Sequence, residues 1–180
     1  MTDADTAAAS AAALTTSVCP GCGAVLAVVP GMTGSRPGAS PSCAGLFEVT
    51  VRGLRDEAGP DLRTAALLQL ATDAYDAQHL PTGGPARAVV RLCLELERDV
   101  DPARAVQLVT DAGPLQTRPT RWTTTVADLA ADLDVVDLPA LVRSWAAAVW
   151  TDWAPAHPAL RAAADAATSG QLPPPSRLGW

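Results

Sequence analysis

Cys19 and Cys22 are the side chains of this sequence whose spacing most clearly suggests chemistry. They stand in the segment Cys19-Pro20-Gly21-Cys22-Gly23. A Pro-Gly turn between two thiols directs both sulfurs to one point, and the glycines let backbone N–H groups turn toward the sulfurs. This is the local sequence of a metal knuckle, for which tetrahedral Zn²⁺ is the commonest occupant. The pair supplies half of a coordination shell, so two further ligands are needed.

Cys43 is the best candidate for the third ligand. It follows Ser40-Pro41-Ser42 at the predicted start of a helix, where the helix dipole and free N–H groups favour a thiolate. The alternative is that Cys43 is simply a small buried side chain. Cys93 lies within the apolar helical segment that contains Leu92 and Leu94, and we expect it in the core.

A histidine is the expected fourth ligand, because zinc sites favour Cys₄, Cys₃His or Cys₂His₂ and Cys93 is set aside. The chain has two histidines. His79 ends a predicted helix, and His157 lies at a joint between two helices. We predict ligation by His79, with His157 as the alternative, and we expect Tyr75 and Gln78 to support the His79 imidazole by hydrogen bonding.

A redox role is the main alternative for Cys19 and Cys22. In redox Cys-x-x-Cys motifs the first cysteine sits at a helix N-terminus, which lowers its pKa. Here Gly23 and the β-prone run 24–29 follow the second cysteine, so no helix dipole is expected.

The sequence also lacks a Gly-rich phosphate loop, a Gly-x-Ser-x-Gly elbow and a His-Glu-x-x-His helix.

Composition excludes several classes of function. The net charge is −6, and all 13 basic residues are arginines scattered along the chain, so we expect no nucleic-acid binding and no attraction to anionic lipid. No apolar run reaches the ~20 residues of a membrane span, and the N-terminus is acidic where a secretory signal is positive. Four unevenly spaced cysteines are not typical of a disulfide framework. We therefore expect a reduced, cytoplasmic protein.

The periodicity of the chain predicts a mainly α-helical bundle with a small N-terminal β-hairpin that carries the knuckle. The runs 14–18 and 24–29 would form the hairpin, and 31–41 a loop. Helices are expected from Ser40 or Ser42 to about 54, and at 61–78, 85–98, 102–110, 125–132, 137–153 and 158–167. We predict a disordered tail at 1–13, one zinc-pinned domain at 14–168, and an extended Pro-rich tail at 169–180.

Three tryptophans, Trp145, Trp150 and Trp153, mark one face of the expected helix 137–153. Such a face could form a partner groove or a platform for a flat ligand. Core packing is the preferred interpretation, because aromatics supply most of the large side chains in this alanine-rich chain.

Three motifs together resemble a family of small bacterial proteins catalogued as a domain of unknown function. They are the knuckle at 19–23, the Ser40-Pro41-Ser42-Cys43 segment, and Asp73-Ala74-Tyr75-x-x-Gln78-His79. The segment 145–157 is similar to the last part of that family, so the resemblance touches most of residues 19–157. Relatives often carry a histidine where this chain has Arg91; any activity that needs that histidine would be missing here. The resemblance implies no reaction.

Two functions remain open at this point. Four protein ligands would close the metal shell, which indicates a structural zinc and a module that binds an unknown protein or small molecule. Alternatively, three ligands and a zinc-bound water would indicate a hydrolase or transferase, with His79 or His157 as acid or base and Asp76 assisting. The number of ligands distinguishes the two.

Overall fold

A computed structural model of the chain describes residues 15–31, 35–81, 84, 86–115 and 117–169. The described helices and strands are β1 (Thr16–Val18), β2 (Val25–Ala27), α1 (Pro41–Thr50), α2 (Arg52–Glu57), α3 (Leu62–His79), α4 (Arg87–Arg98), α5 (Pro102–Leu108), α6 (Val126–Asp132), α7 (Leu138–Asp152), the 3₁₀ turn η1 (Ala154–Ala156) and α8 (His157–Ser169). This confirms the expected mainly helical fold with a small antiparallel hairpin.

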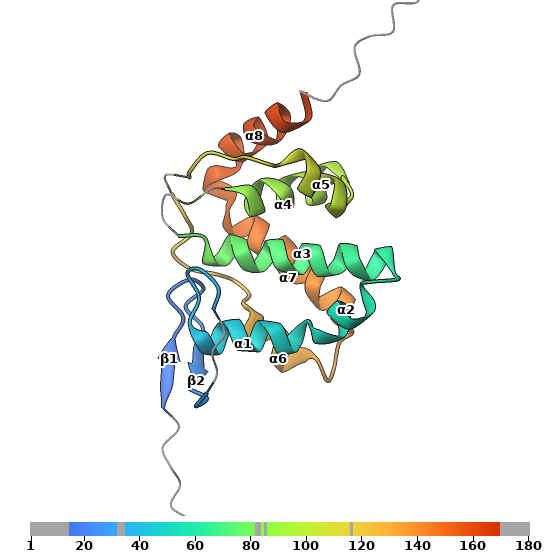
Figure 1. The fold of residues 1–180 in the computed structure, drawn as a ribbon. Coiled ribbons are helices and arrows are strands. Elements are labelled where there is room, and N and C mark those ends of the chain that lie inside the picture. The colour runs from blue at the N-terminus through green and yellow to red at the C-terminus, as the bar shows by residue number, and fades with distance from the viewer. Residues whose placement is uncertain (1–14, 32–34, 82–83, 85, 116, 170–180) are drawn as a thin grey trace, which may run out of the picture.

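The helices are stacked in layers, as Figure 1 shows. Helices α3 and α7 occupy the middle, with α1, α2 and α6 on one side and α4 and α5 on the other, and α8 packs on the far side of α4. The C-terminal half of α3 is buried on nearly every side, including Tyr75, Gln78 and His79. The C-terminal end of α3 is therefore held in place by packing, and the hairpin lies next to it.

Local sequence explains most of the helix boundaries. The Ser40 side chain accepts a hydrogen bond from the Cys43 N–H and caps α1, while Asp61 caps α3 in the same way. Thr125 and Asp128 form a complete capping box at α6. Proline in the first turn begins α1, α5 and α7.

The expected helix from Ser40 to about Leu54 is divided into α1 and α2. The break falls at Val51, whose backbone angles are φ −95° and ψ 7°. The β-branched run Val49-Thr50-Val51 has low helix propensity, which accounts for the interruption at this place. Val51 is fully buried, so core packing fixes the bend.

Several ends differ slightly from expectation. Helix α4 begins at Arg87, and the expected start at Pro85 lies outside the described residues. Helix α8 continues to Ser169, the first residue of the predicted C-terminal tail, and residues 170–180, like the predicted tail 1–13, lie outside the described residues. Within the described part of the chain, no helix has the length and apolar character that crossing a membrane requires.

The tryptophans of α7 belong to the core. Trp145 and Trp153 are almost completely buried, and Trp150 is 7% exposed. The Trp145 ring lies 6.3 Å from Phe47 of α1, and Trp153 packs edge-on against Trp122 at 6.2 Å. The packing interpretation of this face is thus confirmed.

Candidate metal centre

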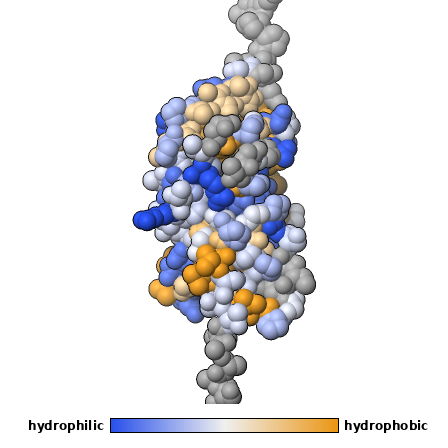
Figure 2. Space-filling model, turned by 90° about the vertical axis from the view of Figure 1, so that its left-hand side faces the viewer, coloured by the Kyte–Doolittle hydropathy of each residue, from blue (hydrophilic) through white to orange (hydrophobic). Residues whose placement is uncertain are grey.

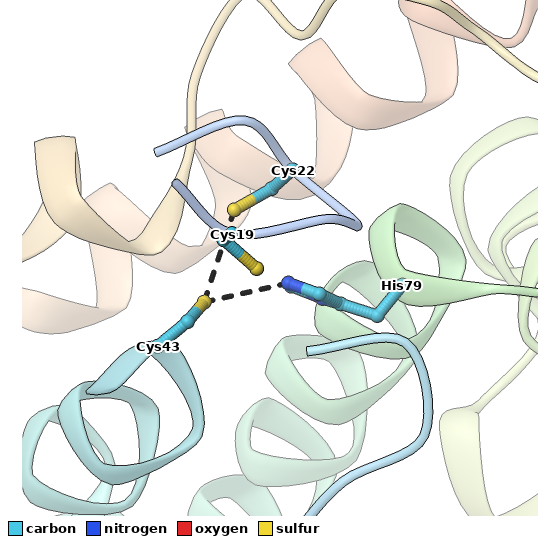
Figure 3. A group of neighbouring side chains, drawn as sticks. All are labelled: Cys19, Cys22, Cys43 and His79. Atoms are coloured by element: carbon cyan, nitrogen blue, oxygen red, sulfur yellow. Dashed lines mark hydrogen bonds between the residues drawn. The ribbon is translucent and has the colours of Figure 1, made fainter. Parts of the chain in front are cut away.

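Four buried side chains converge where the turn of the hairpin meets the start of α1 and the end of α3. They are Cys19 and Cys22 from the turn between β1 and β2, Cys43 from the first turn of α1, and His79 from the last turn of α3 (Figure 3). One ligating atom from each of the four lies within 4.8 Å of the other three. The four predicted ligands are therefore brought together by three separate elements.

The distances between these atoms fit a tetrahedral zinc site. Zn–S bonds of about 2.3 Å and Zn–N bonds of about 2.0–2.1 Å imply S–S edges of about 3.8 Å and S–N edges of about 3.6 Å. The Cys22 Sγ lies 3.8 Å from the Cys43 Sγ, and the Cys43 Sγ lies 3.4 Å from the His79 Nε2. These two edges, together with the convergence of all four atoms within 4.8 Å, fit a metal ion held by three cysteines and one histidine.

The imidazole of His79 is held in the orientation that ligation needs. Its Nδ1 lies 2.7 Å from the backbone carbonyl of Tyr75, and because a carbonyl can only accept, Nδ1 carries the proton. Nε2 then faces the thiols, and it is the ring nitrogen that can give up its proton to a metal ion. The Tyr75 ring stacks on the imidazole at 4.0 Å and on Phe47 at 4.2 Å, which fixes the plane of the His79 ring.

Hydrogen bonds to the sulfurs come from two other groups. The Ser40 N–H donates to the Cys19 Sγ at 3.4 Å, and the Tyr75 hydroxyl donates to the Cys43 Sγ at 3.5 Å. Burial and the contact with Cys43 raise the pKa of Tyr75 above its usual value, so the hydroxyl keeps its proton. Both contacts stabilise thiolate charge inside a buried site.

The electrostatics of the three thiols favour a cation among them. Hydrogen bonds from Cys22 and Cys43 lower the pKa of Cys19, while the contacts with Cys19 and Cys22 raise the pKa of Cys43. Burial lowers the pKa of His79, but its contacts with Cys19 and Cys22 outweigh burial and raise that pKa to about 9. Three thiols in contact cannot all ionise beside one another unless positive charge neutralises them, which a divalent metal would do.

Two glycines allow the knuckle and the loop before α1 to approach His79. A Cβ on Gly21 would stand 2.3 Å from the Cδ2 of His79, and a Cβ on Gly38 would stand 2.0 Å from the His79 carbonyl oxygen. Gly38 also has φ +74°, in the left-handed region. The sequence interpretation recognised the glycines of the knuckle but missed Gly38.

The segment 117–124 also holds the knuckle, a role that sequence reasoning missed. The Gly21 carbonyl accepts from the Arg118 Nη2 at 2.7 Å and from the Trp122 Nε1 at 3.1 Å. Arg118 also donates to the carbonyls of Gln78 and Leu80 at the end of α3. One guanidinium therefore joins the knuckle to the helix that carries His79, across about a hundred residues of sequence.

Gln78 does not support His79 as expected. Its Oε1 accepts from the Trp145 Nε1 at 3.2 Å, and its Nε2 donates to the Thr124 carbonyl at 2.7 Å. Successive helical residues point in directions about 100° apart, so Gln78 faces α7 while His79 faces the thiols. The Tyr75 carbonyl, ring and hydroxyl fill the supporting role instead.

The other two candidates lie away from the cluster. His157 stacks on Trp150 at 3.9 Å, and its Nε2 lies 2.9 Å from the Trp150 carbonyl. Cys93 is fully buried in α4, with its sulfur 3.9 Å from Glu97. Cys93 is thus the core residue that its sequence context predicts, and His157 packs at a helix joint.

Arg91, the residue discussed above for the resemblance, is paired with an acidic side chain in this chain. The Arg91 Nε donates to Asp73 Oδ1 at 2.8 Å, and Asp73 is completely buried. The two residues join α4 to α3.

The family of unknown function DUF5946 matches residues 17–154. The chain belongs to this family. Its matched region contains all four residues of the metal centre and ends close to the expected end of the resemblance. No curated protein and no solved structure matches the chain. The family has no assigned reaction, so its function must be inferred from the site itself.

Proposed function

We propose that this protein binds one Zn²⁺ through Cys19, Cys22, Cys43 and His79, and that the metal has a structural role. The observation that supports this most strongly is the convergence of three sulfurs and one imidazole nitrogen within 4.8 Å of one another in a buried site. Three thiolates and one imidazole are ligands that zinc prefers, and hard cations such as Mg²⁺ bind to oxygen ligands instead.

The metal would fix the N-terminal hairpin on the helices. The strands β1 and β2 have three residues each, and Val18 and Val25 are both 64% exposed, so the hairpin contributes little apolar burial of its own. An isolated hairpin of this size is not stable in water. Ligation couples the knuckle to α1 and α3, and in small zinc modules such coupling contributes on the order of 10 kcal/mol to folding.

A closed ligand set favours a binding role over metal-based catalysis. Catalytic zinc keeps one position for water or substrate, whereas four buried side chains here supply a complete shell. In addition, both ring nitrogens of His79 are already engaged, one by Tyr75 and one by the thiol cluster. The imidazole is therefore poorly placed to act as acid or base.

The hairpin is the surface that such a site would present to a protein partner. Figure 2 shows hydrophobic side chains on the surface at the level of the hairpin. The exposed apolar residues of this segment are Val18, Val25, Val28 and Val29. A partner of apolar character could cover these valines or extend the two-stranded sheet at an open edge.

Cobalt substitution tests the proposal directly. The full chain, purified without chelator, is expected to hold about one Zn²⁺, and after exchange for Co²⁺ to give the intense visible absorption of a four-coordinate ion with thiolate charge-transfer bands. A weak five- or six-coordinate spectrum would show bound water and favour the zinc-enzyme alternative. Substoichiometric metal together with a Cys19–Cys22 disulfide under reducing conditions would favour the redox alternative.

A further inference from the structure

A cavity of about 600 Å³ lies beside the metal centre, between the end of α3, the first turns of α4 and the end of α5. This volume is within the range of small-molecule sites in proteins. Most of its wall is apolar, from three helices and the loop before α1. The apolar residues are Pro37, Leu80, Pro81, Ala88, Val106 and Val109.

The rest of the wall consists of His79, Thr110 and three charged side chains. Two of these three charged side chains already have partners. Arg91 is paired with the buried Asp73, and Asp76 accepts from the Arg36 Nη1 at 3.2 Å. The charges of Arg91 and Asp76 are therefore largely compensated by groups outside the cavity.

Arg87 differs from both. Among the described residues no carboxylate forms an ion pair with it, and its Nη1 donates to the Thr110 carbonyl at 3.4 Å. Arg87 and Arg91 stand one helical turn apart on α4 and both line the cavity. The cavity therefore combines an apolar wall with one uncompensated guanidinium and a second guanidinium that is fixed by Asp73.

We propose that this cavity binds a small amphipathic monocarboxylate, with its apolar body against Val106, Val109 and Leu80 and its carboxylate on Arg87. A guanidinium matches a carboxylate in shape and in hydrogen-bond donors. The single positive charge of Arg87 would be neutralised by the single negative charge of a monocarboxylate. A phosphate dianion would carry a second charge that the wall does not balance, and it would leave the apolar surface uncovered.

The occupant would touch the wall that contains His79. It needs no bond to the metal, because the Nε2 of His79 faces the thiols. The proposal is therefore independent of which metal the centre holds. Metal content measured on the same samples separates a failure of the cavity proposal from a failure of the zinc proposal.

Titration of the full-length, zinc-loaded protein with sodium octanoate tests this site. Amide chemical shifts of α4, the end of α5 and the end of α3 are expected to move with one dissociation constant below about 1 mM. Arg87→Gln should weaken binding about tenfold or more, because it removes the charged partner of the carboxylate. Arg52→Gln removes the same charge from an exposed position on α2 that does not line the cavity, and should leave binding unchanged.

A filling variant checks the location of the ligand. Val106 is 40% exposed, so Val106→Phe can extend into the cavity without overpacking the core, and it should reduce octanoate binding while the melting temperature and zinc content stay as in wild type. Three results would overturn the proposal: no shifts with octanoate, equal binding of octanoate and the neutral 1-octanol with no effect of Arg87→Gln, or binding of inorganic phosphate as tight as that of octanoate.

Discussion

The Nε2 of His79 lies 3.4 Å from the Sγ of Cys43, although the two residues are 36 positions apart in the chain. His79 is the last residue of α3, and Cys43 lies in the first turn of α1. The contact can exist only when the end of one helix faces the beginning of another. Metal binding at this point therefore reports directly on the packing of α1 and α3.

Cys43→Ser is expected to reduce zinc content well below one equivalent, while Cys93→Ser should leave it unchanged. Cys43 contributes one of the four ligating atoms, and Cys93 is a buried core thiol. Replacing Cys93 buries a hydroxyl and costs about 1–3 kcal/mol, so this control protein melts earlier but remains loaded. The test is metal analysis of both variants after purification by the same procedure. Equal loss of zinc from the two would mean that Cys93 is a ligand and that His79 is not.

His79→Ala is expected to lower the melting temperature and to release zinc to a weak chelator sooner than wild type. The loss of one ligand opens the closed site to water, and metal affinity, which is coupled to folding, should fall by more than about tenfold. His157→Ala provides the matched control. It removes a stack on Trp150 and a hydrogen bond, for a cost of about 1 kcal/mol, and should retain its zinc.

Thermal melts with parallel detection of released zinc distinguish the structural from the catalytic role. A His79→Ala protein that stays fully loaded and melts normally would contradict the closed Cys₃His site. The zinc-enzyme alternative would then become the better explanation, with His79 beside a metal-bound water.

Gly38→Ala should destabilise the protein more than Gly23→Ala. Both glycines have positive φ, +74° and +77°, so both substitutions carry the strain of a left-handed alanine, about 1 kcal/mol. Only at Gly38 would the new Cβ also meet the His79 carbonyl oxygen, at 2.0 Å; at Gly23 nothing lies within 4 Å. Because that neighbour is backbone, it must shift with the end of α3, and zinc should be released faster from Gly38→Ala. Denaturant unfolding and chelator competition measure both effects, and equal behaviour of the two variants would disprove the close approach.

The clustering of Cys19, Cys22, Cys43 and His79 was predictable from the sequence, since metal sites of this kind accept few ligand types and the chain offers four cysteines and two histidines. The break in the first helix was not predicted, although the β-branched residues 49–51 at which it falls are a local feature of the sequence. Both features depend on local spacing and on the chemistry of single residues.

Contacts between distant segments were not predictable in the same way. Gln78 binds Trp145, which is 67 residues away, and Arg118 reaches Gly21 across 97 residues. Neither partner is marked by a local pattern, because the pairing depends on how the helices pack. For the same reason the cavity beside α4 had no signature in the sequence.

Glu95→Gln is expected to remove part of the pH dependence of stability. Both carboxyl oxygens of Glu95 are buried, and the group that can share a hydrogen bond with them is the carboxyl of Asp73, to which protonated Glu95 donates. Burial, followed by repulsion from Asp73 of α3, raises the pKa of Glu95 from 4.5 to about 9; Arg91 of the same helix opposes the shift and Asp101 before α5 adds to it. Glu95 lines a second pocket, next to the start of α5, and Asp99 and, from α7, Arg143 line it too. Asp73 and Arg91 already form a neutral pair, so a second carboxylate charge is unfavourable here.

The sign of the effect follows from proton binding. Between about pH 4.5 and pH 9 the folded state holds a proton on Glu95 that the unfolded state has released, so this group stabilises the fold fully below that window and less as the pH rises through it. Glutamine stays neutral at every pH. The melting temperature of zinc-loaded Glu95→Gln should therefore equal that of wild type near pH 5 and exceed it by about 3 °C or more at pH 8.5.

Glu97, on the exposed side of the same helix, is a control of opposite sign. Its hydrogen bond from Arg161, at 2.8 Å, lowers the pKa of Glu97 to about 2, so its contribution is present above the unfolded pKa and is lost only as the pH falls through 4.5 toward 2. Glu97→Gln should therefore show no advantage over wild type at pH 8.5. Because the zinc ligands are the same in all three proteins, their protonation cancels in the differences. If the melting temperature of Glu95→Gln at pH 8.5 is equal to or lower than that of wild type, Glu95 is ionised in the folded protein and its carboxylate contacts solvent or a cation.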